Sequence, residues 1–227
     1  RFGKKSPSSP GLSKILSLSG LLLLAGPSSG RAAILWEAFN DYRPTDGVTS
    51  PNASGYDLRI TGDGGVLRDI KSGNDLKASV EVIVEGTDPD DFGANSQVNA
   101  GSPADKLFNG KVDIGNSGLP GIRNSGGTKL TLVFNGLDPA KRYNFRGTVS
   151  RGGNYNDRWS VFSITGTSAH VAAHEDGSNN KNIITKATLD KAALEPNQVA
   201  LNSGDNKAGS LVGWDNIETG ADGSFAI

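Results

Sequence analysis

The sequence predicts an all-β protein, an antiparallel β-sandwich of the jelly-roll type. Glycine is frequent, at 31 of 227 residues, and short apolar segments alternate with Gly, Asn and Asp, which is typical of strands joined by turns. No stretch keeps a helical period of 3.6 residues for three turns. About a dozen short strands in one unit then favour two packed sheets.

Residues 34–227 are expected to form this sandwich as one domain. The period of two is clearest where Leu132 and Phe134 share one face of a strand and Tyr143 and Phe145 repeat the pattern on the next. The predicted strands are 34–39, 56–61, 78–85, 111–114, 130–134, 142–150, 158–165, 168–174, 182–189, 199–202 and 210–217, with a last strand that begins at Ser224. Short helical turns are predicted at 102–110, where Ser102 caps and Pro103 opens the helix, and at 188–196.

Residues 1–33 are predicted to be a secretory signal peptide. Four basic residues precede an apolar run at 15–25, and small residues follow it. The run is too short for the roughly 20 apolar residues of a spanning helix. We therefore expect an exported protein whose mature domain does not insert into a membrane.

Charge and cysteine content narrow the class of protein further. The 23 basic residues, less the five of residues 1–33, leave 18 against 24 acidic residues, a net charge of −6 for 34–227. This charge argues against a nucleic-acid partner. The chain has no cysteine, and 34–227 is long enough to fold without disulfides. A bacterial secreted or surface protein is expected, with a truncated carboxy terminus because the chain ends inside an apparent strand.

Three segments resemble a known group of proteins: "ADKLFNGKVDIG", "LTLVFNGLDPAKRYNFRGTVSRGGNYNDRWSVFSITG" and "GWDNIETGADGSFAI". Together they resemble secreted modules of planctomycete and verrucomicrobial proteins that carry sorting signals of the PEP-CTERM type. The resemblance covers most of residues 34–227, and its most specific parts are "GLDPAKRY" and "DNIETGADGSF". It implies a galactose-binding-like β-sandwich with a carbohydrate or cell-surface role.

The loop between two predicted strands offers a candidate ligand site. Arg151, Asn154, Tyr155 and Arg158 combine hydrogen-bonding groups with an aromatic ring, which is the chemistry that binds a sugar. Ordinary turn chemistry is the alternative for this loop. Trp159, which follows directly, is predicted to belong to the core.

An acidic turn is a weak candidate for a structural calcium ion. Asp88, Asp90 and Asp91 lie close together with Asn95 nearby, and calcium favours clustered oxygen ligands. The spacing is not that of an EF-hand loop, so a solvated turn is the alternative. The stretch "GADG", with Asp222, is a second and weaker candidate.

Other catalytic and metal-binding motifs are not found in the sequence. His170 and His174 are expected on one strand, about 13 Å apart at ~3.3 Å per residue, too far to share a zinc ion, and both are predicted at the surface. There is no G-x-S-x-G or phosphate-binding loop and no cysteine nucleophile. A carboxylate pair for glycoside cleavage stays open.

The function predicted from the sequence is therefore that of an exported, non-catalytic module. It is expected to bind carbohydrate or a cell-surface polymer through loops at one end of the sandwich. The alternative is a structural or adhesive module of the cell envelope with no small ligand. A glycan-cleaving enzyme is the third hypothesis.

Overall fold

A computed structural model describes most of the chain. The described residues are 15–16, 19–25, 35–42, 44–86, 90–93, 98–115, 120–123, 128–150, 158–179, 181–185, 193–204 and 206–227. For 15–16, 19–25, 90–93 and 120–123 the description covers the backbone only. Strands make up 43% and helices 6%, which confirms the all-β prediction.

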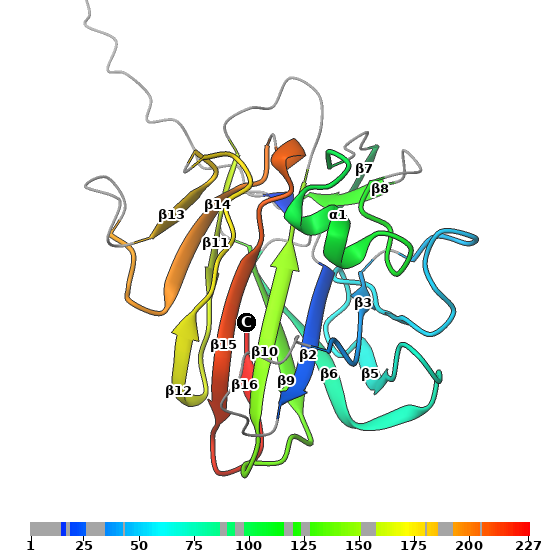
Figure 1. Ribbon diagram of the computed structural model, residues 1–227, viewed down its shortest axis with the longest axis vertical. Helices are drawn as coiled ribbons and strands as arrows, with labels where there is room; N and C mark the ends of the chain where they lie inside the picture. Colours follow the sequence, from blue (N-terminus) through cyan, green and yellow to red (C-terminus); the bar gives the residue numbers. More distant parts are fainter. Residues whose placement is uncertain are drawn as a thin grey trace, which may run out of the picture.

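Six strands form the larger sheet, which faces the viewer in Figure 1. Their order is β12 (Thr167–Ala172), β15 (Val212–Thr219), β10 (Arg142–Thr148), β2 (Ser19–Ala25), β3 (Asn40–Asp41) and β4 (Ser54–Gly55). Neighbouring strands are antiparallel except for β3 and β4, which are parallel. The sheet thus joins strands from both ends of the chain.

The opposite layer consists of two smaller antiparallel sheets. One has the order β16 (Phe225–Ala226), β9 (Lys129–Asn135), β6 (Asp75–Glu85) and β5 (Gly64–Arg68), and the other β11 (Trp159–Ser163), β14 (Gln198–Asn202) and β13 (Ile183–Thr185). Thr165 and Ala226 exchange two backbone hydrogen bonds of 2.9 Å and so connect β11 to β16. In Figure 1, β9 and β6 run behind β10 and β2. The result is a two-layered, sandwich-like arrangement.

A third, small sheet has the order β1 (Ile15–Leu16), β8 (Pro120–Arg123) and β7 (Asp90–Gly93). Its strands pair antiparallel.

Among the described residues, no helix is long and apolar enough to cross a membrane.

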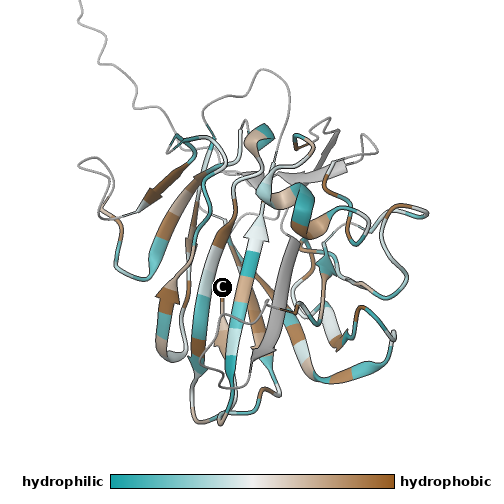
Figure 2. Ribbon diagram, viewed as in Figure 1, coloured by the Kyte–Doolittle hydropathy of each residue, from teal (hydrophilic) through white to brown (hydrophobic). Residues whose placement is uncertain are grey.

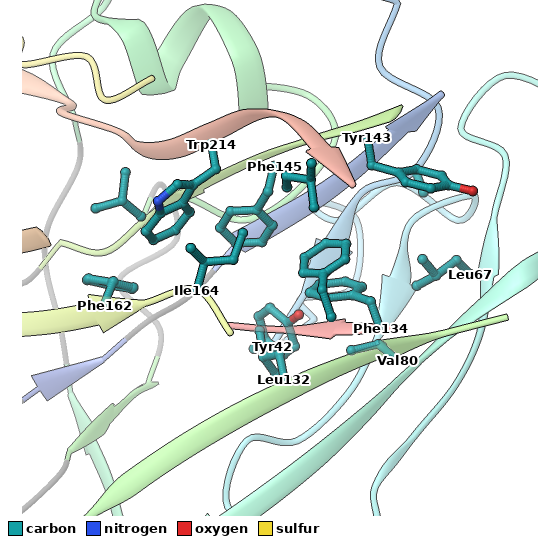
Figure 3. Close-up of a cluster of buried hydrophobic side chains, with 14 of the residues drawn as sticks. Tyr42, Leu67, Val80, Leu132, Phe134, Tyr143, Phe145, Phe162, Ile164 and Trp214 are labelled. Atoms are coloured by element: carbon teal, nitrogen blue, oxygen red, sulfur yellow. The ribbon is translucent and has the colours of Figure 1, made fainter. Parts of the chain in front are cut away.

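The main hydrophobic core fills the space between the two layers. Figure 3 shows Trp214 and Phe145 pointing from the six-stranded sheet toward Phe134 and Leu132 of β9. The rings of Phe134 and Phe145 meet edge to face, with centroids 5.9 Å apart. The period-two pattern of β9 and β10 therefore marks the core face as predicted. Figure 2 shows the interleaving of hydrophobic and hydrophilic residues along β6 and β10.

The outer face of β10 is buried as well. Asn144, Arg146 and Thr148 point away from the core, yet each is at most 6% exposed. A second hydrophobic cluster covers this side of the sheet. Its buried members are Phe39, Ala53, Val98, Ala104, Phe108, Val112, Ile114 and Leu211.

Helix α1 (Pro103–Phe108) supplies two members of this second cluster. As predicted, Ser102 is the N-cap, and its Oγ accepts a hydrogen bond of 3.3 Å from the Asp105 backbone N–H. The Asp105 carboxylate in turn accepts from the Gly101 N–H at 2.7 Å, a variant of the capping box. In Figure 1, α1 lies over the six-stranded sheet near the end of β10.

Three predicted strands are wrong, and seven observed strands were not predicted: β1, β2, β3, β4, β5, β7 and β8, of which β1 and β2 lie in the predicted signal peptide. Residues 35–39, 56–61 and 111–114 are not strands. The turn at 56–61 is held by Asp57 and Asp63, whose carboxylates accept backbone hydrogen bonds at 2.9 and 2.6 Å. Residues 111–114 follow α1 as a turn, and residues 193–196 of the second predicted helical turn are not helical.

Strand β5 was missed because it begins with two glycines. Gly64 has a φ of 140°, and a Cβ there would lie 2.2 Å from the carbonyl oxygen of Val80 on β6. Glycine is needed for that close approach, whereas its usual effect is to weaken a strand.

Candidate ligand-binding pocket

A pocket of about 570 Å³ lies between α1 and the outer face of the six-stranded sheet. Its volume falls in the range of roughly 300–1,000 Å³ that is usual for ligand sites. The described lining residues are Leu35, Trp36, Phe39, Ile70, Lys71, Pro103, Lys106, Leu107, Lys111, Arg146, Glu175 and Leu211. The pocket therefore combines an apolar wall with several charged groups.

Arg146, at the base of this wall, is held by several contacts. Its side chain is 6% exposed, and its guanidinium makes a bidentate pair with Asp215, with Nη1–Oδ1 and Nη2–Oδ2 distances of 2.7 and 3.2 Å. Nη1 also donates to the carbonyl oxygen of Phe145 at 2.9 Å. Nε makes no hydrogen bond with any described residue, and the nearest carboxylate oxygen, on Glu175, is 3.8 Å away. A buried donor without a hydrogen bond is costly, so Nε is the part of the guanidinium whose hydrogen bonding is incomplete within the described chain.

Gly213 makes the room that Arg146 occupies. A Cβ at this position would lie 2.6 Å from Cδ and 2.8 Å from Nη1 of Arg146. It would also lie 2.8 Å from the carbonyl oxygen of Ala173. The glycine is thus required by space rather than by backbone conformation.

Aromatic rings and cations meet in the pocket. Cζ of Arg146 lies 5.6 Å from the centroid of the half-buried Trp36 ring. Nζ of Lys111 lies 5.1 Å from the centroid of Phe39 and donates a 2.8 Å hydrogen bond to the Leu107 carbonyl oxygen. Both cations are therefore within cation–π range, and both are fixed in place.

His174 contacts Gly213, the residue that lies against Arg146. Its Nδ1 accepts a 3.0 Å hydrogen bond from the Gly213 N–H, and its ring meets Trp214 edge to face at 5.4 Å. Burial, and next the positive charge of Arg146, lower the pKa of His174 to about 4. His174 is therefore neutral near pH 7 and half-buried, which corrects the prediction of a surface residue. His170 is also half-buried, and its Nδ1 lies 2.9 Å from Oγ1 of Thr167.

The predicted loop site falls largely outside the described residues. Arg151, Asn154 and Tyr155 are not described. Arg158 is half-buried, and its carbonyl oxygen accepts hydrogen bonds from the Ser203 N–H and hydroxyl at 2.7 and 2.8 Å. Its backbone thus anchors the start of β11, while the sugar-binding role of the loop stays a prediction.

Trp159 does not belong to the core, so that prediction is wrong. Ser160 and Phe162 are the buried residues of β11, whereas Trp159 is half-buried on the opposite face. Val161, on the same face as Trp159, is 39% exposed. The strand is buried on one face only.

The calcium candidates gain no support from the described part of the chain. Asp88 is not described, and Asp90 and Asp91 lie on β7, where only the backbone is described. Among described residues, no group of three or more His, Cys, Asp or Glu could hold a metal ion. The Asp222 carboxylate accepts from the Ser224 N–H and hydroxyl at 3.1 and 2.8 Å, as in an ordinary turn.

No protein-family model, curated protein or solved structure matches this chain.

The sequence did not single out the pocket because its residues come from distant segments. Trp36, Lys106, Arg146 and Glu175 each stand in a different element or loop. One local signal was present: an arginine in the middle of β10, where every residue from Tyr143 to Thr148 is buried. A buried arginine requires a charged partner. That partner is Asp215 on β15.

Proposed function

We propose that this protein is an exported, non-catalytic module that binds carbohydrate or another cell-surface polymer. The fold that we propose is a jelly roll of the galactose-binding-like type, which the two-layered antiparallel arrangement supports. The observation that carries the proposal is a pocket of about 570 Å³ that places Trp36 beside Arg146.

The chemistry of the pocket suits a sugar. The apolar face of a sugar ring packs against an aromatic side chain, as the half-buried Trp36 would allow. Hydroxyl groups need fixed donors and acceptors. Nε of Arg146 supplies a donor and Glu175 an acceptor at the same wall. Small-molecule sites typically have this mixture of apolar lining and few polar groups.

Binding fits the pocket better than cleavage does. Glycoside hydrolysis requires two carboxyl groups that flank the scissile bond. Glu175 is the one carboxylate among the described lining residues of the pocket. Asp215 is already engaged by Arg146 at 2.7 Å.

A glycan-array screen of the purified protein tests this function. We expect a reproducible hit that Trp36→Ala abolishes and Trp159→Ala leaves unchanged, because Trp36 lines the pocket and Trp159 does not. Loss of the hit in Arg151→Ala with Tyr155→Ala, but not in Trp36→Ala, would move the site to the 151–158 loop. A blank array with folded protein would contradict the proposal and favour a structural or adhesive envelope module.

A further inference from the structure

The pocket has an excess of positive charge. Its described lining includes the four cations Lys71, Lys106, Lys111 and Arg146 but a single carboxylate, Glu175. Even when Asp215, the partner of Arg146, is counted, the net charge is +2. From this excess we infer that the ligand is an acidic glycan, a saccharide that carries carboxylate or sulfate groups. The inference rests on the carbohydrate-binding function proposed above.

Arg146 offers one donor to such a ligand. Its two Nη atoms are used by Asp215 and by the Phe145 carbonyl oxygen. Nε is buried and forms no hydrogen bond within the described chain. A carboxylate or sulfate oxygen of the ligand is the acceptor that completes its hydrogen bonding, and charge-assisted bonds of this kind are stronger than neutral ones.

Two of the lining cations, Lys71 and Lys106, come from different segments of the chain. Lys106 extends from α1, and Lys71 follows β5; both are exposed. Neither makes an ion pair within 4.0 Å with any residue that the structure describes. Neither lysine is therefore held by a carboxylate at ion-pair distance, whereas Nζ of Lys111 is bonded to the Leu107 carbonyl oxygen.

The charge of the whole chain makes this excess informative. The net charge is −1 for residues 1–227, so the protein as a whole does not attract polyanions. Affinity for an acidic glycan must then arise locally, where cations gather around an aromatic ring. Salt would screen the attraction between an acidic ligand and these cations, and so weaken binding.

Titration calorimetry with matched polysaccharides tests the inference. The probes are polygalacturonate and its methyl ester, and dextran sulfate and dextran, each at 50 and 300 mM NaCl. We expect at least one acidic probe to bind at least tenfold more tightly than its neutral counterpart, with weaker binding at high salt. Lys71→Glu with Lys106→Glu should lower that affinity at least tenfold. The control is Lys77→Glu, because Lys77 is exposed on β6 in the other layer. This substitution should change the affinity less than twofold.

The outcomes separate the inference from the function on which it rests. Selective binding of polygalacturonate or of dextran sulfate supports it and identifies the acidic group. Equal binding of neutral and charged probes, or equal effects of the control and pocket variants, overturns the inference while glycan binding stands. If no probe binds and the glycan array is also blank, the proposed function fails as well. Thermal unfolding of each variant shows that the substitutions leave the fold intact.

Discussion

Arg146 depends on the glycine beside it. Because a Cβ at position 213 would lie 2.6 Å from Cδ of Arg146, Gly213→Ala must displace the guanidinium from its pair with Asp215. We expect a loss of about 1–3 kcal/mol in unfolding free energy from overpacking. Ligand affinity should fall by roughly tenfold or more through the lost charged hydrogen bond.

A double-mutant cycle checks this account of Gly213. In an Arg146→Ala background, where the displaced side chain is absent, Gly213→Ala should cost less than in the wild type. Equal costs in urea denaturation of the two backgrounds would show that Gly213 acts independently of Arg146.

His174 gives the stability of the fold a dependence on pH. Its pKa in the folded protein is about 4, below the ordinary value of 6.5, so protonation favours the unfolded state. The stability that the fold gains from keeping this imidazole neutral is complete above pH 6.5. It is lost as the pH falls from 6.5 to about 4. We expect a loss on the order of 2–3 kcal/mol over this window, measured by urea denaturation.

The matched variant is His174→Asn, whose Oδ1 can accept from the Gly213 N–H in place of Nδ1. It should remove the part of the pH dependence that belongs to the imidazole. Wild-type and variant curves that stay parallel between pH 6.5 and 4 would contradict the assignment.

At the scale of elements, the N-cap of α1 is a contact through which the pocket can be loosened by one substitution. Ser102→Ala removes the cap that accepts from the Asp105 N–H, and we expect a loss of about 0.5–2 kcal/mol in unfolding free energy. Affinity should fall too, because α1 carries Lys106 and Leu107 of the pocket. Urea denaturation and calorimetry measure the two effects.

The control for this prediction is Ser168→Ala on β12. Within the described part of the chain its exposed hydroxyl makes two long hydrogen bonds, of 3.3 and 3.5 Å, so stability and affinity should barely change. An affinity that survives Ser102→Ala would mean that the lysine and leucine of α1 contribute little to binding.

Sequence patterns predicted the elements that have one apolar face or a local capping signal. Strands β6, β9 and β10 and the cap of α1 were predicted because alternation and the Ser-Pro pair are local features. The predicted strand at 56–61 failed because the carboxylates of Asp57 and Asp63 hold a turn. The pocket could not be predicted, since its lining comes from α1, β10 and loops that are far apart in the sequence.

Strand β2 leads to a prediction about the exported protein. Its backbone pairs with β10 along seven residues, from Arg142↔Ala25 to Thr148↔Ser19, yet the same segment lies in the predicted signal peptide. We expect the exported protein to begin near residue 34, so that β10 loses this partner. The amides of β10 that bond to β2 should then exchange faster with solvent than in the uncleaved chain.

Amino-terminal sequencing and hydrogen exchange of both forms make this comparison. An exported protein that retains Ser19–Ala25 would contradict the signal-peptide prediction. Equal exchange in the two forms would show that the pairing of β2 adds no protection to β10.

The molecule as a whole combines a net charge of −1 with a pocket of net charge +2. The two layers enclose the main core, and the second cluster under α1 leaves the pocket on the outer face of the six-stranded sheet. The pocket therefore lies apart from the main core, whereas Phe39 and Leu211 belong both to its lining and to the second cluster. Substitutions at the pocket rim are therefore expected to alter affinity with little effect on stability.

The most direct test of the central claim follows the indole N–H signals of the three tryptophans by NMR during titration with trigalacturonate. The account predicts that the signal of Trp36, in the pocket, shifts while that of Trp159, on β11, does not. A shift confined to Trp159 would place the site at the neighbouring loop. No shift at Trp36, with an acidic glycan demonstrably bound, would contradict the claim that the Arg146 pocket is the binding site.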